Sequence, residues 1–225
     1  MQNHSEMKNF HLPGHTYFIC SRNSSGLSSF FDDACCRFFL TRLLHSLRQF
    51  HTDLHAYCFT PDAVLMLLTP RTPTALSHLW ASVSRQYESY FSCRFARNSS
   101  GLLREFHGCL ILGEAAVLDT YKYIERAPLE RNLCDHPGVH QWSSYCSNAF
   151  GSAFSSLKKH PELNSFLAAS GIGPSDYREF LACPFSRERL EQLHNSLLHG
   201  NVFQDGNERP SIVLSLSLGP THKHS

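Results

Sequence analysis

The sequence predicts an α+β fold: a ferredoxin-like split βαβ antiparallel sheet with helices on one face, plus a helical C-terminal extension. Three observations lead to this prediction. Short β-rich runs and longer runs of helical periodicity follow one another in the order strand, helix, strand, strand, helix, strand. Residues 63–68 are an unbroken apolar run closed by turn residues at both ends, which is typical of a buried central strand. The composition, 42% hydrophobic and 17% charged, is that of a globular chain.

The first half of the chain supplies most of the sheet. Residues 16–21 are rich in β-branched and aromatic side chains and predict the first strand. After a polar loop at 22–29, Asp32 or Asp33 is placed to cap a helix that runs to about Phe50. Residues 54–60 and 63–68 then form two strands joined by a tight turn at Pro61-Asp62.

The second half is mostly helical. We expect helices at 74–92 and 114–125, a strand within 102–112, and three short helices at 161–169, 174–182 and 186–199. This divides the chain into a flexible N-terminus (1–11), a main domain (12–150), a helical extension (151–204) and a flexible tail (205–225).

Composition and charge restrict the class of protein. No apolar run is long enough to span a bilayer, and the N-terminus lacks the apolar core of an export signal, so we expect no membrane partner. Nine scattered cysteines without a CxxC pair predict reduced thiols and a cytoplasmic location. The net charge of +1 is small for a nucleic-acid-binding protein and argues against tight binding at neutral pH.

Several short pieces of the chain, in one order, resemble a known family. They are LPG at 12–14, FFDD at 30–33, LHAY at 54–57, LLTP at 67–70, YIE at 123–125 and WSSY at 142–145, with weaker pieces at 177–180 and 200–202. Together they resemble the single-tyrosine HUH transposases, and most closely the REP-associated tyrosine transposase branch, over roughly residues 10–150.

The resemblance implies a chemistry whose side chains are replaced in this sequence. In the family, two histidines on the second hairpin strand hold a divalent metal, Mg²⁺ or Mn²⁺, and a tyrosine on the third helix attacks the scissile phosphate. The matching positions here are Ala63, Leu65 and Ala116. Members of a catalytic unit fail together, so we expect no catalytic residues, no metal cofactor and no DNA cleavage by that mechanism.

Three groups of residues are alternatives to this interpretation. Tyr121 or Tyr123 could be a relocated nucleophile, and His55 with Asp62 could be relocated metal ligands. Cys134, His136, His140 and Cys146 have a spacing that could hold zinc, although it is not that of a standard zinc finger. For each group, the sequence favours an ordinary structural role.

The resemblance also implies a nucleic-acid partner, because the family grips hairpins of single-stranded DNA. Such grips combine basic side chains on phosphates with aromatic rings under bases. The candidates here are Arg22, Arg85, Tyr87, Arg94, Phe95 and Arg97. Residues 85–131 hold seven basic and six acidic residues, so no basic stripe stands out.

These inferences predict a catalytically inactive, transposase-derived bacterial protein that binds palindromic or hairpin DNA, REP-like in kind, and acts as a domesticated regulator of transcription. One alternative is a divergent active transposase for DNA transposition. The other is a protein-interaction module that has lost DNA binding. Whether the protein forms a homodimer is left open.

Overall fold

The computed structural model describes residues 12–22, 28, 30, 32–96, 102–103, 106–151, 154, 156–169 and 174–205. The predicted flexible segments at 1–11 and 205–225 lie outside these ranges, apart from Asp205.

The core of the molecule is a five-stranded sheet. Its strands are β1 (Thr16–Arg22), β2 (Thr52–Thr60), β3 (Ala63–Pro70), β4 (His107–Leu112) and β5 (Val202–Gln204). They lie in the order β2-β3-β1-β4-β5, and every pair among the first four is antiparallel. This order confirms the predicted split βαβ fold. The short β5, which pairs in parallel with β4, was not predicted from the sequence.

Strand β3 is the central strand that its apolar run predicted. It pairs with β1 on one side and β2 on the other, and all of its residues are buried. Side chains alternate between the two faces of a strand, so Val64 and Met66 pack on one face while Leu65 and Leu67 pack on the other. At one end of the sheet, Arg22 lies opposite Ala63.

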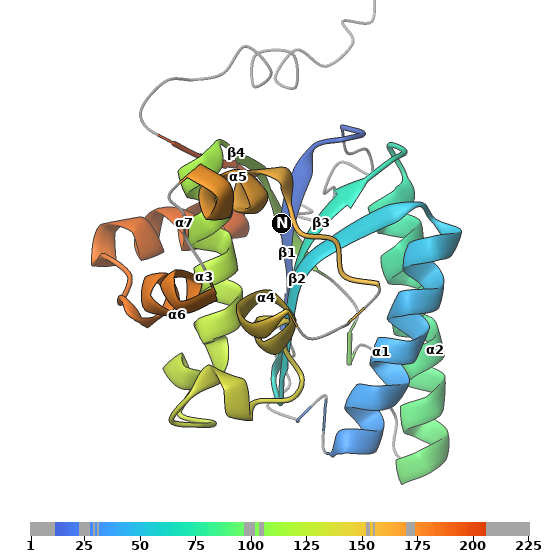
Figure 1. The fold of residues 1–225 in the computed structure, drawn as a ribbon. Coiled ribbons are helices and arrows are strands. Elements are labelled where there is room, and N and C mark those ends of the chain that lie inside the picture. Colours follow the sequence, from blue (N-terminus) through green and yellow to red (C-terminus); the bar gives the residue numbers. More distant parts are fainter. Residues whose placement is uncertain are drawn as a thin grey trace, which may run out of the picture.

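Helices α1 (Asp33–Gln49) and α2 (Ala75–Phe95) cover one face of the sheet and are the helical layer that the sequence predicted (Figure 1). The side chain of Asp32 caps α1 by accepting a hydrogen bond from the Cys35 amide at 2.9 Å. Helix α2 ends at Phe95 and is followed by the C-cap residue Ala96, which has a left-handed conformation with φ of 48°.

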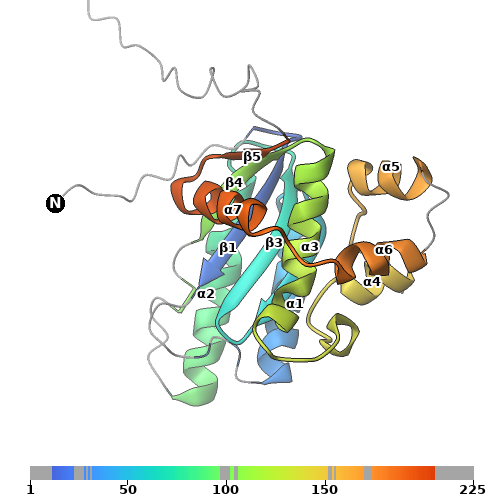
Figure 2. The ribbon, with the colours of Figure 1, turned by 90° about the vertical axis from the view of Figure 1, so that its left-hand side faces the viewer.

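The opposite face is covered by helix α3 and by the C-terminal part of the chain (Figure 2). The elements are α3 (Glu114–Glu130), the 3-10 turn η1 (Pro137–Val139), α4 (Tyr145–Phe150), α5 (Pro161–Ala169), α6 (Pro174–Ala182) and α7 (Arg187–His199). Leu163, Tyr177, Leu193 and Phe203 from the extension are buried in the same apolar cluster as the sheet residues. The extension therefore completes the core of the sheet, while its boundary at residue 151 stays a prediction.

The C-terminal half also covers the outer edge of β2. Phe59 N donates to Trp142 O at 2.9 Å, Ser144 N donates to Tyr57 O at 2.9 Å, and Lys158 N donates to Leu54 O at 2.8 Å. An unpaired edge strand is a template for pairing with other chains, so these contacts protect it.

None of the nine cysteines, all of which lie in the described ranges, forms a disulfide. None of the helices in the described ranges has the length and hydropathy needed to cross a bilayer.

Candidate nucleic-acid interface

The positions that the resemblance assigns to metal ligands and nucleophile are filled by apolar packing. Ala63, Leu65 and Ala116 are each 0% exposed. Leu65 on β3 and Ala116 on α3 belong to one cluster between the sheet and α3, together with Phe18 and Tyr121. Methyl and isobutyl groups cannot coordinate a hard cation, which requires oxygen or nitrogen donors. These residues therefore do not fit a metal ion.

The other candidate metal ligands are engaged elsewhere. Among the residues that the structure describes, no three His, Cys, Asp or Glu side chains converge as a metal site would require. In the proposed zinc set, His136 Nδ1 accepts from Gly138 N at 3.0 Å, and His140 Nε2 donates to Phe59 O at 2.8 Å. Asp62 lies 3.3 Å from the Nε of Arg131 in an ion pair.

His55 is held by structural hydrogen bonds at the other end of the sheet. Its Nδ1 donates to Lys158 O at 2.7 Å, and its Nε2 lies 2.8 Å from the Thr69 hydroxyl. Both ring nitrogens are thus occupied, and burial lowers the pKa of the imidazole.

The two candidate tyrosines differ in their surroundings. Tyr121 is 0% exposed, and its hydroxyl accepts a hydrogen bond from His160 N at 3.1 Å, so it has no access to a substrate. Tyr123 is half-buried, and its hydroxyl meets His194 Nε2 at 3.0 Å.

The predicted DNA-binding residues fall on two faces of the molecule. Arg22, at the end of β1, is directed to the α3 side, because its Nη2 donates to the Tyr123 hydroxyl at 3.4 Å. Arg85, Arg94 and Phe95 lie on α2, on the other face of the sheet. Arg97 is outside the described residues.

Tyr87 requires a correction. Its side chain is 0% exposed and packs among Phe30, Phe38, Phe39 and Phe91. The helical period turns Tyr87 toward α1 and the sheet, so the ring is a core residue and has no free face for a base.

A stack of two rings and two guanidinium groups links α1 and α2. The rings of Phe38 and Tyr90 are parallel within 8°, with centroids 4.0 Å apart. The Arg42 guanidinium lies 5.2 Å from the Phe38 centroid, and that of Arg94 lies 5.8 Å from the Tyr90 centroid. We call Arg42, Phe38, Tyr90 and Arg94 the arginine–aromatic stack. Each cation is held by a ring face, so the charged groups are positioned before any ligand arrives.

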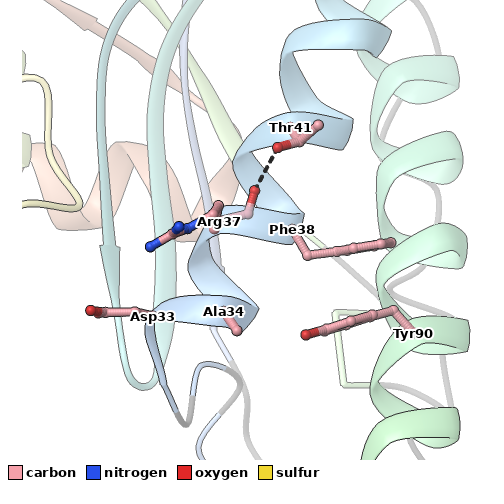
Figure 3. A pocket seen from close by; sticks show the side chains of 6 residues that line it. All are labelled: Asp33, Ala34, Arg37, Phe38, Thr41 and Tyr90. Atoms are coloured by element: carbon pink, nitrogen blue, oxygen red, sulfur yellow. Dashed lines mark hydrogen bonds between the residues drawn. The ribbon is translucent and has the colours of Figure 1, made fainter.

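The stack borders a shallow groove of about 490 Å³ (Figure 3). Its lining consists of Asp33, Ala34, Arg37, Phe38, Thr41 and Tyr90. In Figure 3, Phe38 reaches from α1 toward α2, Tyr90 reaches back below it, and Arg37 extends to the other side of α1. The groove thus offers apolar rings beside exposed positive charge.

The charged residues of α1 are almost all basic. After Asp33 the helix has no acidic residue, whereas Arg37, Arg42 and Arg48 are basic. Neither Arg37 nor Arg42 is within ion-pair distance of a carboxylate in the described part of the chain, whereas Arg94 pairs with Asp32 at 2.6 Å. Sequence reasoning missed Arg37, Phe38 and Arg42. The absence of acidic residues from a surface helix was the signal that could have found them.

Fold and surface together define the class of this protein: a split βαβ α+β protein with a covered sheet and a basic, aromatic helical face. Comparison with protein-family models and with curated protein sequences finds no match. Among solved structures, a REP-associated tyrosine transposase bound to a REP hairpin is similar in fold, with a TM-score of 0.55 and 15% sequence identity. The match covers 69% of this chain and 98% of that one. At this identity the likeness shows a transposase-like fold.

A second solved structure, tRNA(His) guanylyltransferase from Saccharomyces cerevisiae, matches 90% of this chain and 84% of its own. Its TM-score of 0.41 and identity of 11% are too low to establish a shared fold.

Proposed function

We propose that this protein binds hairpin or single-stranded DNA without cleaving it, and that it acts by occupying its DNA as a regulator. The observation that carries the proposal is the arginine–aromatic stack on α1 and α2, together with the exposed Arg37, which has no ion-pair partner among the described residues. Support comes also from the transposase-like fold, since the similar structure holds a REP hairpin.

Lack of cleavage is the second part of the proposal. It is supported by the apolar packing of Ala63, Leu65 and Ala116, which puts neither a metal ligand nor a nucleophile at the three positions that match the chemistry of the transposases. A non-cleaving protein with a retained DNA grip can still block or mark a site. A domesticated regulatory role follows from that reasoning.

DNA binding is tested by fluorescence anisotropy with a labelled single-stranded hairpin at low salt, beside an unstructured strand and a blunt duplex. We expect Arg37→Gln and Arg42→Gln each to weaken binding by about 3-fold to 10-fold and to lower the salt slope by about 1 if one phosphate contact is lost. The matched control is Arg187→Gln. Arg187 is 93% exposed on α7, at the opposite face, and pairs with Glu191.

The outcomes separate the alternatives. Absence of binding at low salt would reject the proposal and favour a protein-interaction module. An equal loss in Arg187→Gln would show that only net charge matters and that the α1–α2 face is not the interface.

A further inference from the structure

A second polar cluster lies on the other face of the sheet. It joins Arg22 at the end of β1, Tyr123 on α3 and His194 on α7. Arg22 Nη2 lies 3.4 Å from the Tyr123 hydroxyl, which lies 3.0 Å from His194 Nε2. The Tyr123 ring is fixed edge-to-face against Phe18, with centroids 5.5 Å apart. Three elements therefore present their polar groups to one point.

The chemistry of the donors sets the direction of these hydrogen bonds. A guanidinium only donates, so the Tyr123 oxygen accepts from Arg22 and its hydroxyl proton is directed to His194 Nε2. Burial, together with the charges of Arg22 and Arg131, lowers the pKa of His194. The imidazole is therefore a neutral acceptor that can gain a proton when an anion arrives.

Positive charge at this cluster is not balanced. Arg22 is exposed, and in the described ranges no carboxylate lies within ion-pair distance of it. The charged and titratable groups around the cluster are Cys20 on β1, Asp62 in the β2–β3 turn and Arg131 after α3. Asp62 already pairs with Arg131 at 3.3 Å. A single bound anion would compensate the surplus.

We propose that Arg22, Tyr123 and His194 form a binding site for one phosphodiester group. A guanidinium fork, a phenolic hydroxyl and an imidazole are donors that suit phosphate oxygens. The inference deepens the proposed function and rests on it for the identity of the ligand, a phosphate of bound DNA.

The topology would allow one DNA strand to contact both this phosphate site and the arginine–aromatic stack. Strand β1 ends at Arg22, α1 begins after it, and α2 ends at Phe95, so both sites lie at the same end of the sheet. The β2–β3 turn at 61–62 lies between the two faces at this end. A DNA strand that passes over this end would meet the arginine–aromatic stack on one face and Arg22 on the other.

The test uses dimethyl phosphate, whose single negative charge does not titrate near neutral pH, and follows the His194 ring by NMR. We expect added dimethyl phosphate to raise the titration midpoint of His194, because the anion stabilises the imidazolium. Binding should therefore tighten as the pH falls through that midpoint. Arg22→Gln should weaken binding about 10-fold, as expected for losing a charge-assisted contact.

Two further variants make the result specific. Tyr123→Phe keeps the ring packed on Phe18 and should weaken binding less than Arg22→Gln does. Arg187→Gln on the same helix as His194 should leave the titration midpoint unchanged. An unchanged midpoint in dimethyl phosphate, or an equal rise in Arg22→Gln, would overturn the inference.

The hairpin anisotropy assay separates the two proposals. If the protein binds the hairpin but dimethyl phosphate does not shift His194, the phosphate site is wrong and the proposed function stands. If dimethyl phosphate shifts His194 and no DNA binds, the site exists and the proposed function is wrong.

Discussion

Glu125 is a completely buried carboxylate, and no basic side chain in the described ranges forms an ion pair with it. It accepts hydrogen bonds from Ser144 Oγ at 2.6 Å, Asn148 Nδ2 at 2.7 Å and Tyr177 OH at 2.9 Å. Burial raises its pKa to about 7 in spite of these three donors. The residue therefore ties α4 and α6 to α3, while its burial favours the protonated form.

This arrangement predicts a pH-dependent stability that Glu125→Gln removes. The folded pKa of about 7 is above the unfolded value of 4.5, so the stabilisation is present below pH 4.5 and is lost as the pH rises through 7. Urea unfolding of the two proteins should give similar stability near pH 4.5. At pH 8 the glutamine variant should be more stable, by roughly 3 kcal/mol at most.

The same urea-unfolding comparison of wild type and Glu125→Gln can contradict this prediction. Parallel stability curves between pH 4.5 and 8 would mean that Glu125 titrates normally, and that burial does not raise its pKa.

Residue types in the sequence indicated some of this chemistry but not its geometry. The YIE and WSSY pieces were recognised separately, yet their link is the bond from Ser144 to Glu125 across 19 residues of sequence. Similarly, Tyr87 has a residue type suited to stacking on a base, and only its helical phase places it in the core. Burial depends on the packing of distant elements, and single-residue patterns do not contain that information.

At the scale of elements, a chain of hydrogen bonds fastens the segment before α5 to the sheet. Glu162 N donates to His160 Nδ1 at 3.1 Å, so His160 Nε2 donates to Thr16 Oγ1 at 2.8 Å. The Thr16 hydroxyl lies 2.9 Å from that of Thr69, which donates to His55. The whole chain requires both imidazoles to be neutral.

Acid should therefore release this segment. Burial, with the charge of His55, lowers the pKa of His160 to about 4, below the ordinary 6.5. The stabilisation is present above pH 6.5 and is lost as the pH falls through about 4. Hydrogen exchange of the Lys158 amide, which bonds Leu54 O, should accelerate relative to that of core amides across this range.

The control is His160→Gln, which retains a donor for Thr16 but does not titrate. Its Lys158 amide should show a smaller relative change, because only His55 remains to titrate in this hydrogen-bond chain. The same pH response in this variant would assign the effect to another group.

A second set of hydrogen bonds joins the end of the extension to the start of α3. Asp205 accepts from Ala115 N at 3.0 Å and from Ala116 N at 2.6 Å, which caps the helix from a distance. Gly113 makes room for it, since a Cβ there would clash with the Asp205 carboxylate. Gly113 also has φ of 95° and ψ of 159°, a conformation almost restricted to glycine.

Gly113→Ala should therefore destabilise the protein by about 2–4 kcal/mol, from backbone strain and loss of the cap together. The matched variant is Gly151→Ala, where φ is 67° and nothing lies within 4 Å of the added carbon. Its cost should be that of the left-handed conformation alone, about 1–2 kcal/mol. Equal losses in urea unfolding would contradict the cap.

For the whole molecule, the sequence predicted the order of the first four strands and two helices, because each has a clear hydrophobic period. It did not predict β5, since three residues after a helix form a strand only when β4 offers an edge. The cover over the α3 face was also missed. Its helices were expected as separate pieces, and their common core depends on contacts between residues far apart in sequence.

For the candidate interface too, the sequence predicted some residues and missed others. The sequence identified Arg22, Arg85, Arg94 and Phe95 as basic and aromatic residues, and the structure separates them onto two faces. Arg37, Phe38 and Arg42 were passed over because α1 was interpreted only for its buried side. A helix that packs on a sheet also has an outer face, and here that outer face has the charge.

The central claim is that a transposase-like scaffold holds DNA without cutting it. The most direct measurement incubates an end-labelled single-stranded hairpin with the protein in Mg²⁺ or Mn²⁺. The protein–DNA complex is isolated under native conditions, and its label is then analysed on a denaturing gel. We predict that all label recovered from the complex migrates as intact, protein-free DNA. Shortened label, or label covalently attached to the protein, would contradict the account.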